Sequence, residues 1–361
     1  MIAVLASLTV TVMTQAQNGL DSVLISQARL NFAVPDLPAF KAVGNNPGTI
    51  LRPSTPEALS VVASSFIGPS GIMLPKTLAA EFNPALAVFA DKITLSEYRK
   101  RSQLYSIRLS LGTSADSAGI ISSAIGIRST LIDDGDMKND QKQTDSLYAV
   151  LSREVQKRAE LTDEYLKLRG ITEEQFAENT EIQAAVDRYL KDRCKSDVDT
   201  IISKMKTVYK EEHWNARKLD IALAAVAQST DSTGGNTHFR AADAWITLAL
   251  PVGKVGQWLI GGNARVNNDV ENDSVSFCAA LSTRLYLGSN RYKGFFEAQY
   301  KYDGADAANF IFGNGGAELN IHQCVWLDLS LGLNYDFESK DKSVIPGFSF
   351  RYALPENFKF F

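Results

Sequence analysis

Apolar and polar positions alternate along much of this chain. Residues 325–337 read Val-Trp-Leu-Asp-Leu-Ser-Leu-Gly-Leu-Asn-Tyr-Asp-Phe, with an apolar residue at every odd position and mostly polar or small residues at the even ones. Because successive side chains of a β-strand point to opposite faces, this period of two gives the strand one apolar and one polar face. The pattern recurs up to the C-terminus and predicts a series of amphipathic strands.

About twelve segments carry this pattern, and the last eight alternate most cleanly. We predict strands at residues 57–67, 77–90, 104–114, 118–131, 217–230, 240–251, 256–268, 274–288, 292–303, 309–322, 325–338 and 344–354. Their lengths match the roughly 9 to 11 residues that a tilted strand needs to cross a bilayer. The prediction is therefore an all-β membrane protein, an antiparallel transmembrane β-barrel of about twelve strands built from residues 57–131 and 217–361. The alternative is a soluble β-protein that buries its apolar strand faces inside.

Residues 132–216 break the alternation between the fourth and fifth predicted strands. This segment is dense in charged residues, contains no proline, and places apolar residues at helical spacing. Thr172 and Gln175 predict a capping box, and Gly170 predicts the end of the preceding helix. We predict an α-helical insert with helices at about 144–169, 172–192 and 196–213. An even number of strands places the barrel ends and this insert on the periplasmic side.

Two segments precede the first predicted strand. Residues 1–16 form a short apolar run ending in Thr14-Gln15-Ala16, which predicts a signal peptide. Residues 17–56 contain five prolines, which disfavour helices and central strands. Apolar residues such as Leu37 and Phe40 favour packing over disorder. This irregular Pro-rich segment is therefore either a plug in the barrel or a periplasmic lead-in.

Composition excludes fewer classes of function than the alternation of apolar and polar residues does. The 361-residue chain has a formal net charge of -4 and a mean hydropathy of -0.10. This charge excludes a strongly basic nucleic-acid binder, so we expect no nucleic-acid partner. The mean hydropathy is compatible with a barrel because lumen-facing and lipid-facing residues cancel along each strand. The three cysteines have no CxxC spacing and predict free thiols, with one disulfide as the alternative.

Charged residues on the polar face of the predicted strands are the candidate lumen lining. A charge that faces lipid near the bilayer midplane costs about 2–4 kcal/mol, which favours the inward orientation. The set, in which the signs are nearly balanced, is Glu81, Arg108, Arg128, Asp220, Asp243, Arg265, Arg284, Glu297, Lys301, Glu318, Asp328, Asp336 and Arg351. Balanced charges predict a closed lumen with internal salt bridges, and the alternative is a polar pore that selects solutes by a local excess of one sign.

The sequence contains little that predicts catalysis. His213, His238 and His322 are not placed for a catalytic group on the outer wall of a barrel, and no nucleophile, zinc or phosphate-loop motif is found. We therefore expect no enzyme, and predict no catalytic residues, metal site or cofactor.

The C-terminal strand carries the one resemblance to known proteins. Phe348, Phe350 and Tyr352 alternate in the last strand, and Phe361 supplies a terminal aromatic residue. This pattern resembles the assembly signal of Gram-negative outer-membrane β-barrel proteins, although Pro355-Glu356-Asn357 interrupts it. The resemblance implies a bacterial outer-membrane location, with the lipid bilayer and the barrel-assembly machinery as partners.

Three functions follow from these predictions. The first is a porin-like channel or transport protein. The second is a sealed barrel that acts as a scaffold or subunit of an envelope complex, with residues 132–216 binding a periplasmic or envelope protein. An outer-membrane enzyme is the minor alternative.

Overall fold

The computed structural model describes most of the chain after the first 19 residues. Described are residues 20–21, 23–30, 32, 36–43, 50–54, 59–64, 67–68, 71–72, 77–89, 93–115, 120–193, 198–230, 236–270, 273–305, 308–322, 325–337, 340 and 342–352. The signal peptide predicted at residues 1–16 and the terminal Phe361 lie outside these residues, as do Cys194 and Cys324. Cys278 is a free, buried thiol.

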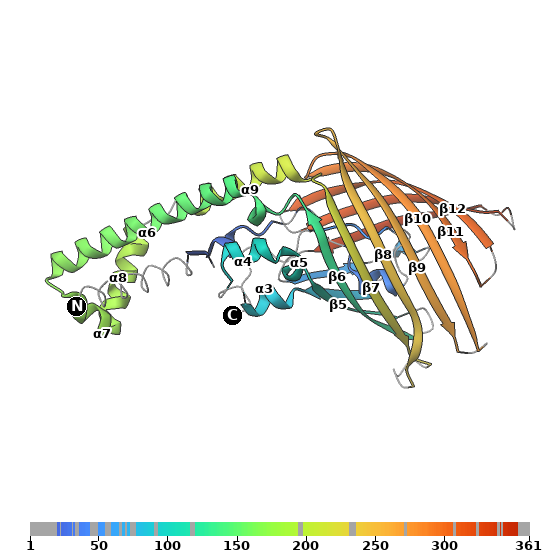
Figure 1. The fold of residues 1–361 in the computed structure, drawn as a ribbon, viewed down its shortest axis with the longest axis horizontal. Helices are drawn as coiled ribbons and strands as arrows, with labels where there is room; N and C mark the ends of the chain where they lie inside the picture. The colour runs from blue at the N-terminus through green and yellow to red at the C-terminus, as the bar shows by residue number, and fades with distance from the viewer. Residues whose placement is uncertain are drawn as a thin grey trace.

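Twelve antiparallel strands form one sheet (Figure 1). They are β1 (Leu59–Ser64), β4 (Thr77–Phe82), β5 (Arg108–Ala115), β6 (Ile121–Asp133), β7 (Lys218–Gln228), β8 (His238–Val252), β9 (Gly256–Asp269), β10 (Ser274–Gly288), β11 (Tyr292–Asp303), β12 (Ala308–His322), β13 (Val325–Asp336) and β14 (Lys342–Tyr352). Each pairs with its sequence neighbour in the sheet, and β1 also pairs with β14 through Val61 and Tyr352, so that the sheet runs round a barrel. The predicted sheet of twelve antiparallel strands is confirmed. A small hairpin, β2 (Ile67–Gly68) and β3 (Gly71–Ile72), lies between β1 and β4 in the chain.

The alternation along each strand separates an outer from an inner face. In β13, Leu329, Leu331 and Leu333 are exposed, whereas Trp326 and Gly332 on the other parity are buried. The leucines therefore cover the outside of the barrel, and the opposite positions face inward. The two faces that the period of two predicted for residues 325–337 are confirmed.

The strand predicted at residues 77–90 is too long. It ends at Phe82, and Pro84–Phe89 form helix α3. Pro84 stands at the first helical position, where proline is favoured, and the Asn83 side chain accepts a hydrogen bond from the Leu86 amide at 2.9 Å. The helix start signal therefore overrides the alternation.

The strand predicted at residues 104–114 starts later than expected. Residues 95–105 form helices α4 (Leu95–Lys100) and α5 (Ser102–Tyr105), and β5 begins at Arg108. Thr94 and Glu97 form a capping box that starts α4. Tyr105 stacks on Tyr98 with ring centroids 5.6 Å apart, so it lies in the helical layer at the end of the barrel.

A long helical arm leaves the barrel between β6 and β7 (Figure 1). We use this name for α6 (Gln141–Arg169), α7 (Glu173–Glu178), α8 (Thr180–Arg193) and α9 (Val198–His213), which follow a short 3-10 turn, η1 (Met137–Asn139). At 1.5 Å per residue, the 29 residues of α6 span about 44 Å. Gly170 ends α6 with φ 63°, and Thr172 caps α7 together with Gln175, as predicted. Among the described residues, no helix combines the length and apolar character required to cross a membrane.

The base of the arm packs on the barrel end. One apolar cluster contains Leu147 of α6, Tyr209 of α9, and Leu259 and Phe295 of the barrel wall. A hydrogen bond of 2.6 Å from the Tyr98 hydroxyl to Asp136 joins α4 to the turn before the arm. The base of the arm, the turn before it and α4 therefore pack together at this end of the barrel.

An N-terminal plug fills part of the interior. We define it as residues 36–43, which include helix α2 (Pro38–Ala42), and residues 50–54. Helix α2 contacts β4 to β8, and the described plug residues other than Val43 are buried. A Cβ at Gly126 would lie 2.6 Å from Ser110 Oγ and 3.0 Å from Pro38, and one at Gly112 would lie 3.1 Å from the Ala39 carbonyl carbon. These glycines on the inner wall therefore allow the close approach of α2.

Replacing Gly126 should destabilise the plugged barrel. We expect Gly126→Val to lower the free energy of unfolding by about 1–3 kcal/mol, because the added methyl groups overpack the contact with α2. Gly313→Val is the matched control, since a Cβ at Gly313 meets nothing within 4 Å. Urea titration of the refolded protein in detergent micelles measures both. Equal stabilities for the two variants would contradict the packing role of Gly126.

Candidate functional site in the barrel lumen

The charged residues predicted to line the lumen lie on the inner face wherever their side chains are described. Buried are Glu81, Arg108, Arg128, Asp220, Asp243, Arg284, Glu297 and Glu318, and half-buried are Arg265, Lys301 and Asp328. The side chains of Asp336 and Arg351 lie outside the described set, although their backbones belong to β13 and β14. The structure gathers the buried charges into two clusters and one separate ion pair.

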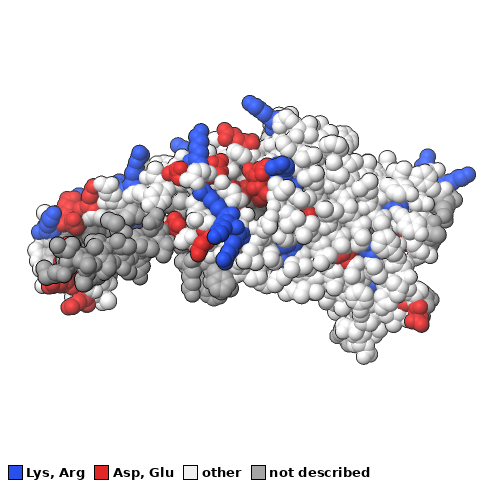
Figure 2. Space-filling view, in the orientation of Figure 1, with Lys and Arg blue, Asp and Glu red and all other residues white. Residues whose placement is uncertain are grey.

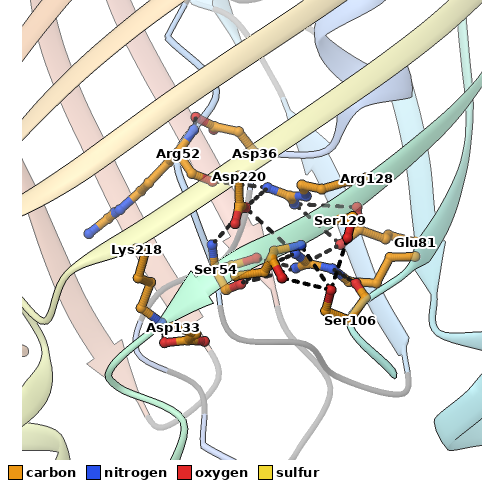
Figure 3. Close-up of polar contacts among 12 residues, drawn as sticks. Asp36, Arg52, Ser54, Glu81, Ser106, Arg128, Ser129, Asp133, Lys218 and Asp220 are labelled. Carbon is orange, nitrogen blue, oxygen red and sulfur yellow. Dashed lines mark hydrogen bonds and ion pairs between the residues drawn. The ribbon is translucent and has the colours of Figure 1, made fainter. Parts of the chain in front are cut away.

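The first cluster is a quartet of two arginines and two carboxylates (Figure 3). Arg128 lies 3.2 Å from Glu81 and 3.5 Å from Asp220. Arg108 lies 3.6 Å from Glu81 and 3.5 Å from Asp220. Because β5 and β6 place Arg108 opposite Arg128 in register, the two like charges need the carboxylates between them. The quartet has no net charge, which favours its burial.

The quartet also binds the plug backbone. Arg108 donates to the Ser54 carbonyl at 3.2 Å and to the Ser54 hydroxyl at 2.6 Å. Arg128 donates to the Arg52 carbonyl at 3.0 Å, and the Ser54 amide donates to Asp220 at 3.4 Å. Wall side chains therefore supply hydrogen bonds that an irregular buried segment cannot make with itself.

The second cluster receives a side chain from the plug. Arg52 Nη1 lies 2.5 Å from Glu318 Oε2, and the Tyr286 hydroxyl donates to Glu318 Oε1 at 2.6 Å. Arg284 pairs with Glu297 at 2.5 Å and donates to the Tyr286 hydroxyl at 2.8 Å. The guanidinium of Arg52 also lies over the Tyr286 ring, 4.6 Å from its centroid. Charged hydrogen bonds of this kind are the strong ones in a protein interior.

The separate ion pair holds the other end of the plug. Arg265 lies 3.2 Å from Asp243 and donates to the Ala42 carbonyl, at the end of α2, at 3.0 Å. The Ala39 amide donates to Ser110 Oγ at 3.2 Å. Lys301 pairs with Asp303 at 2.8 Å, near the barrel end opposite the arm. Most of the buried lumen charges therefore act to neutralise one another and to hold the plug.

Sequence reasoning missed Arg52 of the plug, Lys293, which lies 3.6 Å from Glu318, and Lys218, which pairs with Asp133 at 3.0 Å. Lys293 and Lys218 share the inward parity of Glu297 and Asp220 in their strands, so parity alone was sufficient to find them. Arg52 lies in an irregular segment without period, and no local signal indicates its partner 266 positions away.

Among the described residues, no group of three or more His, Cys, Asp or Glu could hold a metal ion.

Comparisons with known proteins identify no family. No family model matches the chain, and no curated protein matches it. Among solved structures, the siderophore receptor PirA from Pseudomonas aeruginosa matches with 10% sequence identity and a TM-score of 0.27. The match covers 82% of this chain and 42% of the receptor chain, so the chain spans less than half of that receptor. Fold and site by themselves define a plugged barrel of twelve strands.

Breaking the quartet should destabilise the protein strongly. We expect Arg128→Met to lower the free energy of unfolding by about 3–5 kcal/mol, because it leaves buried carboxylates with one cation instead of two. The double variant Arg128→Met, Glu81→Leu should lose less than the sum of the two single variants. Arg158→Met, which removes an exposed pair with Glu154 on the arm, should cost no more than about 0.5 kcal/mol. Additive losses in the double variant would show that the pair does not act as a unit.

Proposed function

We propose that the chain is an outer-membrane β-barrel that passes solutes when its plug is displaced, and that the structure represents its closed state. Three properties support this proposal. They are the apolar outer wall, the position of the arm at the barrel end that has the short turns, and the presence inside the barrel of a segment that is not part of the sheet.

The outer wall has the character of a lipid-facing surface. In β7 and β9 to β13, as far as the structure describes them, the outward positions carry no Asp, Glu, Lys or Arg. On the face of the barrel that Figure 2 shows, few charged side chains are visible, whereas charged side chains gather on the helical arm. Exposed aromatic residues lie near both rims, for example Tyr292 at one end of β11 and Tyr302 at the other. Ten residues of a strand tilted by 35–45° rise roughly 25 Å, the height of the apolar band in such barrels.

The connections indicate which end is periplasmic. At the arm end, β8–β9, β10–β11 and β12–β13 connect through only two or three residues, and at the other end every connection has four or more. Bacterial outer-membrane barrels have short periplasmic turns and longer extracellular loops. We infer that the arm lies in the periplasm.

The observation that carries the proposal is that the plug lies inside the barrel, where charged side chains of the wall bind its backbone. Where the plug lies, the inner wall is built from small residues, including Gly112, Gly126, Ala124 and Ala222. Eight strands give an interior that wall side chains can fill, whereas twelve strands enclose more space. A barrel that served only as an anchor has no need of a separate segment packed inside it. Displacement of the plug leaves a path lined with polar and charged groups.

The outer wall should not tolerate charge. We expect Leu331→Arg to lower the free energy of unfolding in lipid vesicles by about 2–4 kcal/mol, because it places a guanidinium in the apolar band. Leu331 is 56% exposed, and Leu168 on the arm is 72% exposed, so Leu168→Arg is the matched control and should change little. Urea titration of folding into vesicles measures both variants. If Leu331→Arg matches the control, the wall faces water and the proposal fails.

Locking the plug should close the channel. A Cβ at Gly112 would lie 3.3 Å from the Ala39 Cβ, close enough for a disulfide after a small shift. We expect the variant Ala39→Cys, Gly112→Cys, with Cys194, Cys278 and Cys324 replaced by serine, to be silent in a planar bilayer when oxidised. Reduction should restore brief openings, and Arg52→Gln in the unlocked protein should lengthen them.

The controls for this experiment are the serine-substituted protein and each single cysteine variant, which should not respond to reductant. Equal currents before and after reduction would show that the plug does not gate the path. Silence of all variants, including Arg52→Gln, would exclude a channel and favour a sealed barrel.

A scaffold is the second candidate function, and the arm is the observation that favours it. The arm extends away from the barrel and exposes apolar residues such as Val155 and Val208 (Figure 1). A surface of this kind suits a periplasmic or envelope protein. This function requires that the barrel stay sealed, so the bilayer recordings distinguish it from the first.

A further inference from the structure

We propose that the root of the helical arm is the latch of the plug, so that displacement of the arm releases the plug. By root we mean Trp214 and Asn215, which join α9 to β7. This inference rests on the proposed gating function, and it assigns the control of the gate to the arm.

A chain of buried contacts leads from the root to the plug. The Lys293 ammonium lies over the Trp214 ring, 5.4 Å from its centroid, and 3.6 Å from Glu318 Oε2. The same Glu318 oxygen binds Arg52 of the plug at 2.5 Å. All four side chains are buried, and Lys293 is only 2% exposed. Two cations from different parts of the chain therefore share one carboxylate oxygen.

Three aromatic rings hold the Lys293 ammonium in place. Besides Trp214, it lies 5.2 Å from the centroid of Trp326 and 5.5 Å from that of Tyr286. A desolvated cation is stabilised by aromatic faces, and tryptophan is the strongest of them. Trp326 and Tyr286 belong to barrel strands, whereas Trp214 is supplied by the arm. Withdrawal of Trp214 opens one wall of this cage and weakens the position from which Lys293 meets Glu318.

Apolar packing provides a second link between arm and plug. Ile50 of the plug belongs to the same buried cluster as Leu147, Ile202 and Tyr209 of the arm. Ile50 also lies against Gly261 of the wall, where an added Cβ would approach its Cγ1 to 2.8 Å. Plug, barrel wall and arm base therefore share one buried apolar cluster, and a shift of the arm disturbs that cluster.

The hydrogen bonds of Asn215 fix the point at which a displacement of the arm reaches the barrel. Its side-chain amide donates to the carbonyls of Gly253 and Gly256 at 3.0 and 2.7 Å, in the turn between β8 and β9. These bonds hold the root against the barrel end while the arm extends beyond it. A periplasmic protein that binds the arm and tilts it therefore pulls directly on Trp214 and Asn215.

The test measures plug exposure separately from conduction. In the full chain with its three cysteines replaced by serine, Leu51→Cys places a thiol on a buried plug residue. The rate of its reaction with a charged maleimide in lipid nanodiscs reports plug release. We expect Trp214→Leu to raise this rate roughly tenfold or more, which corresponds to about 1.4 kcal/mol. Arg52→Gln, which removes the direct anchor, should raise it at least as much.

Two variants control for other effects of losing a tryptophan. Trp258→Leu alters an outward-facing tryptophan of the wall and should leave the labelling rate within about twofold of the parent. Trp214→Phe keeps an aromatic face toward Lys293 and should give a rate between those of the parent and Trp214→Leu. Heat-modifiable migration in electrophoresis verifies that each variant has folded.

The outcomes separate the two proposals. If Arg52→Gln raises labelling but Trp214→Leu does not, the arm root is not the latch, and the proposed gating by the plug is unaffected. If both raise labelling while the bilayer stays silent, the latch holds but the path is not a channel. If no variant raises labelling, the plug is permanent and the latch is refuted.

Discussion

Charge enclosed within an apolar wall is the constraint on which the rest of the structure depends. The outer face of the strands carries large apolar side chains, so the charged residues of the same strands turn inward and lose contact with water. Burial of an unpaired ion is very costly, and each such group needs a partner inside the barrel. The quartet around Arg108 and Arg128 and the pairs around Glu318 meet that need. The plug completes them, because Arg52 and the Ser54 backbone supply partners that the wall lacks.

The buried charges also affect how the plug is held in the lumen and how it can be displaced. The plug is held by two kinds of contact, hydrogen bonds and ion pairs on the one hand and apolar packing on the other. In the apolar clusters, Leu37, Phe40 and Leu51 of the plug pack with wall residues such as Ala79 and Ala124. Polar contacts of this kind are directional and can be exchanged for water, whereas a core of interlocked apolar side chains resists hydration. The polar share of these contacts is therefore compatible with reversible displacement of the plug in a way that purely apolar contacts are not.

Sequence pattern was informative where the physical signal is periodic. The alternation at residues 325–337 predicted both the strand and its two faces, and parity placed Arg284 and Glu297 on one wall. It failed at residues 77–90, where the helix start at Asn83 and Pro84 outweighs an apolar run. The partners of Arg52 and the aromatic cage of Lys293 were beyond reach, because they depend on positions brought together only by closure of the sheet. Contacts between residues that are hundreds of positions apart produce no pattern within a short stretch of sequence.

The seam between the first and last strands has a consequence for the order of folding. Val61 and Tyr352 pair although they stand 291 positions apart (352 − 61), and Arg52 meets Glu318 across 266 positions. Loop-closure entropy makes contacts of such separation late events in folding. Because the plug directly precedes β1 in the chain, bringing β1 to β14 also carries the plug into the curved sheet. Closure of the sheet at this seam therefore brings the plug along, and the plug does not have to thread through a finished pore.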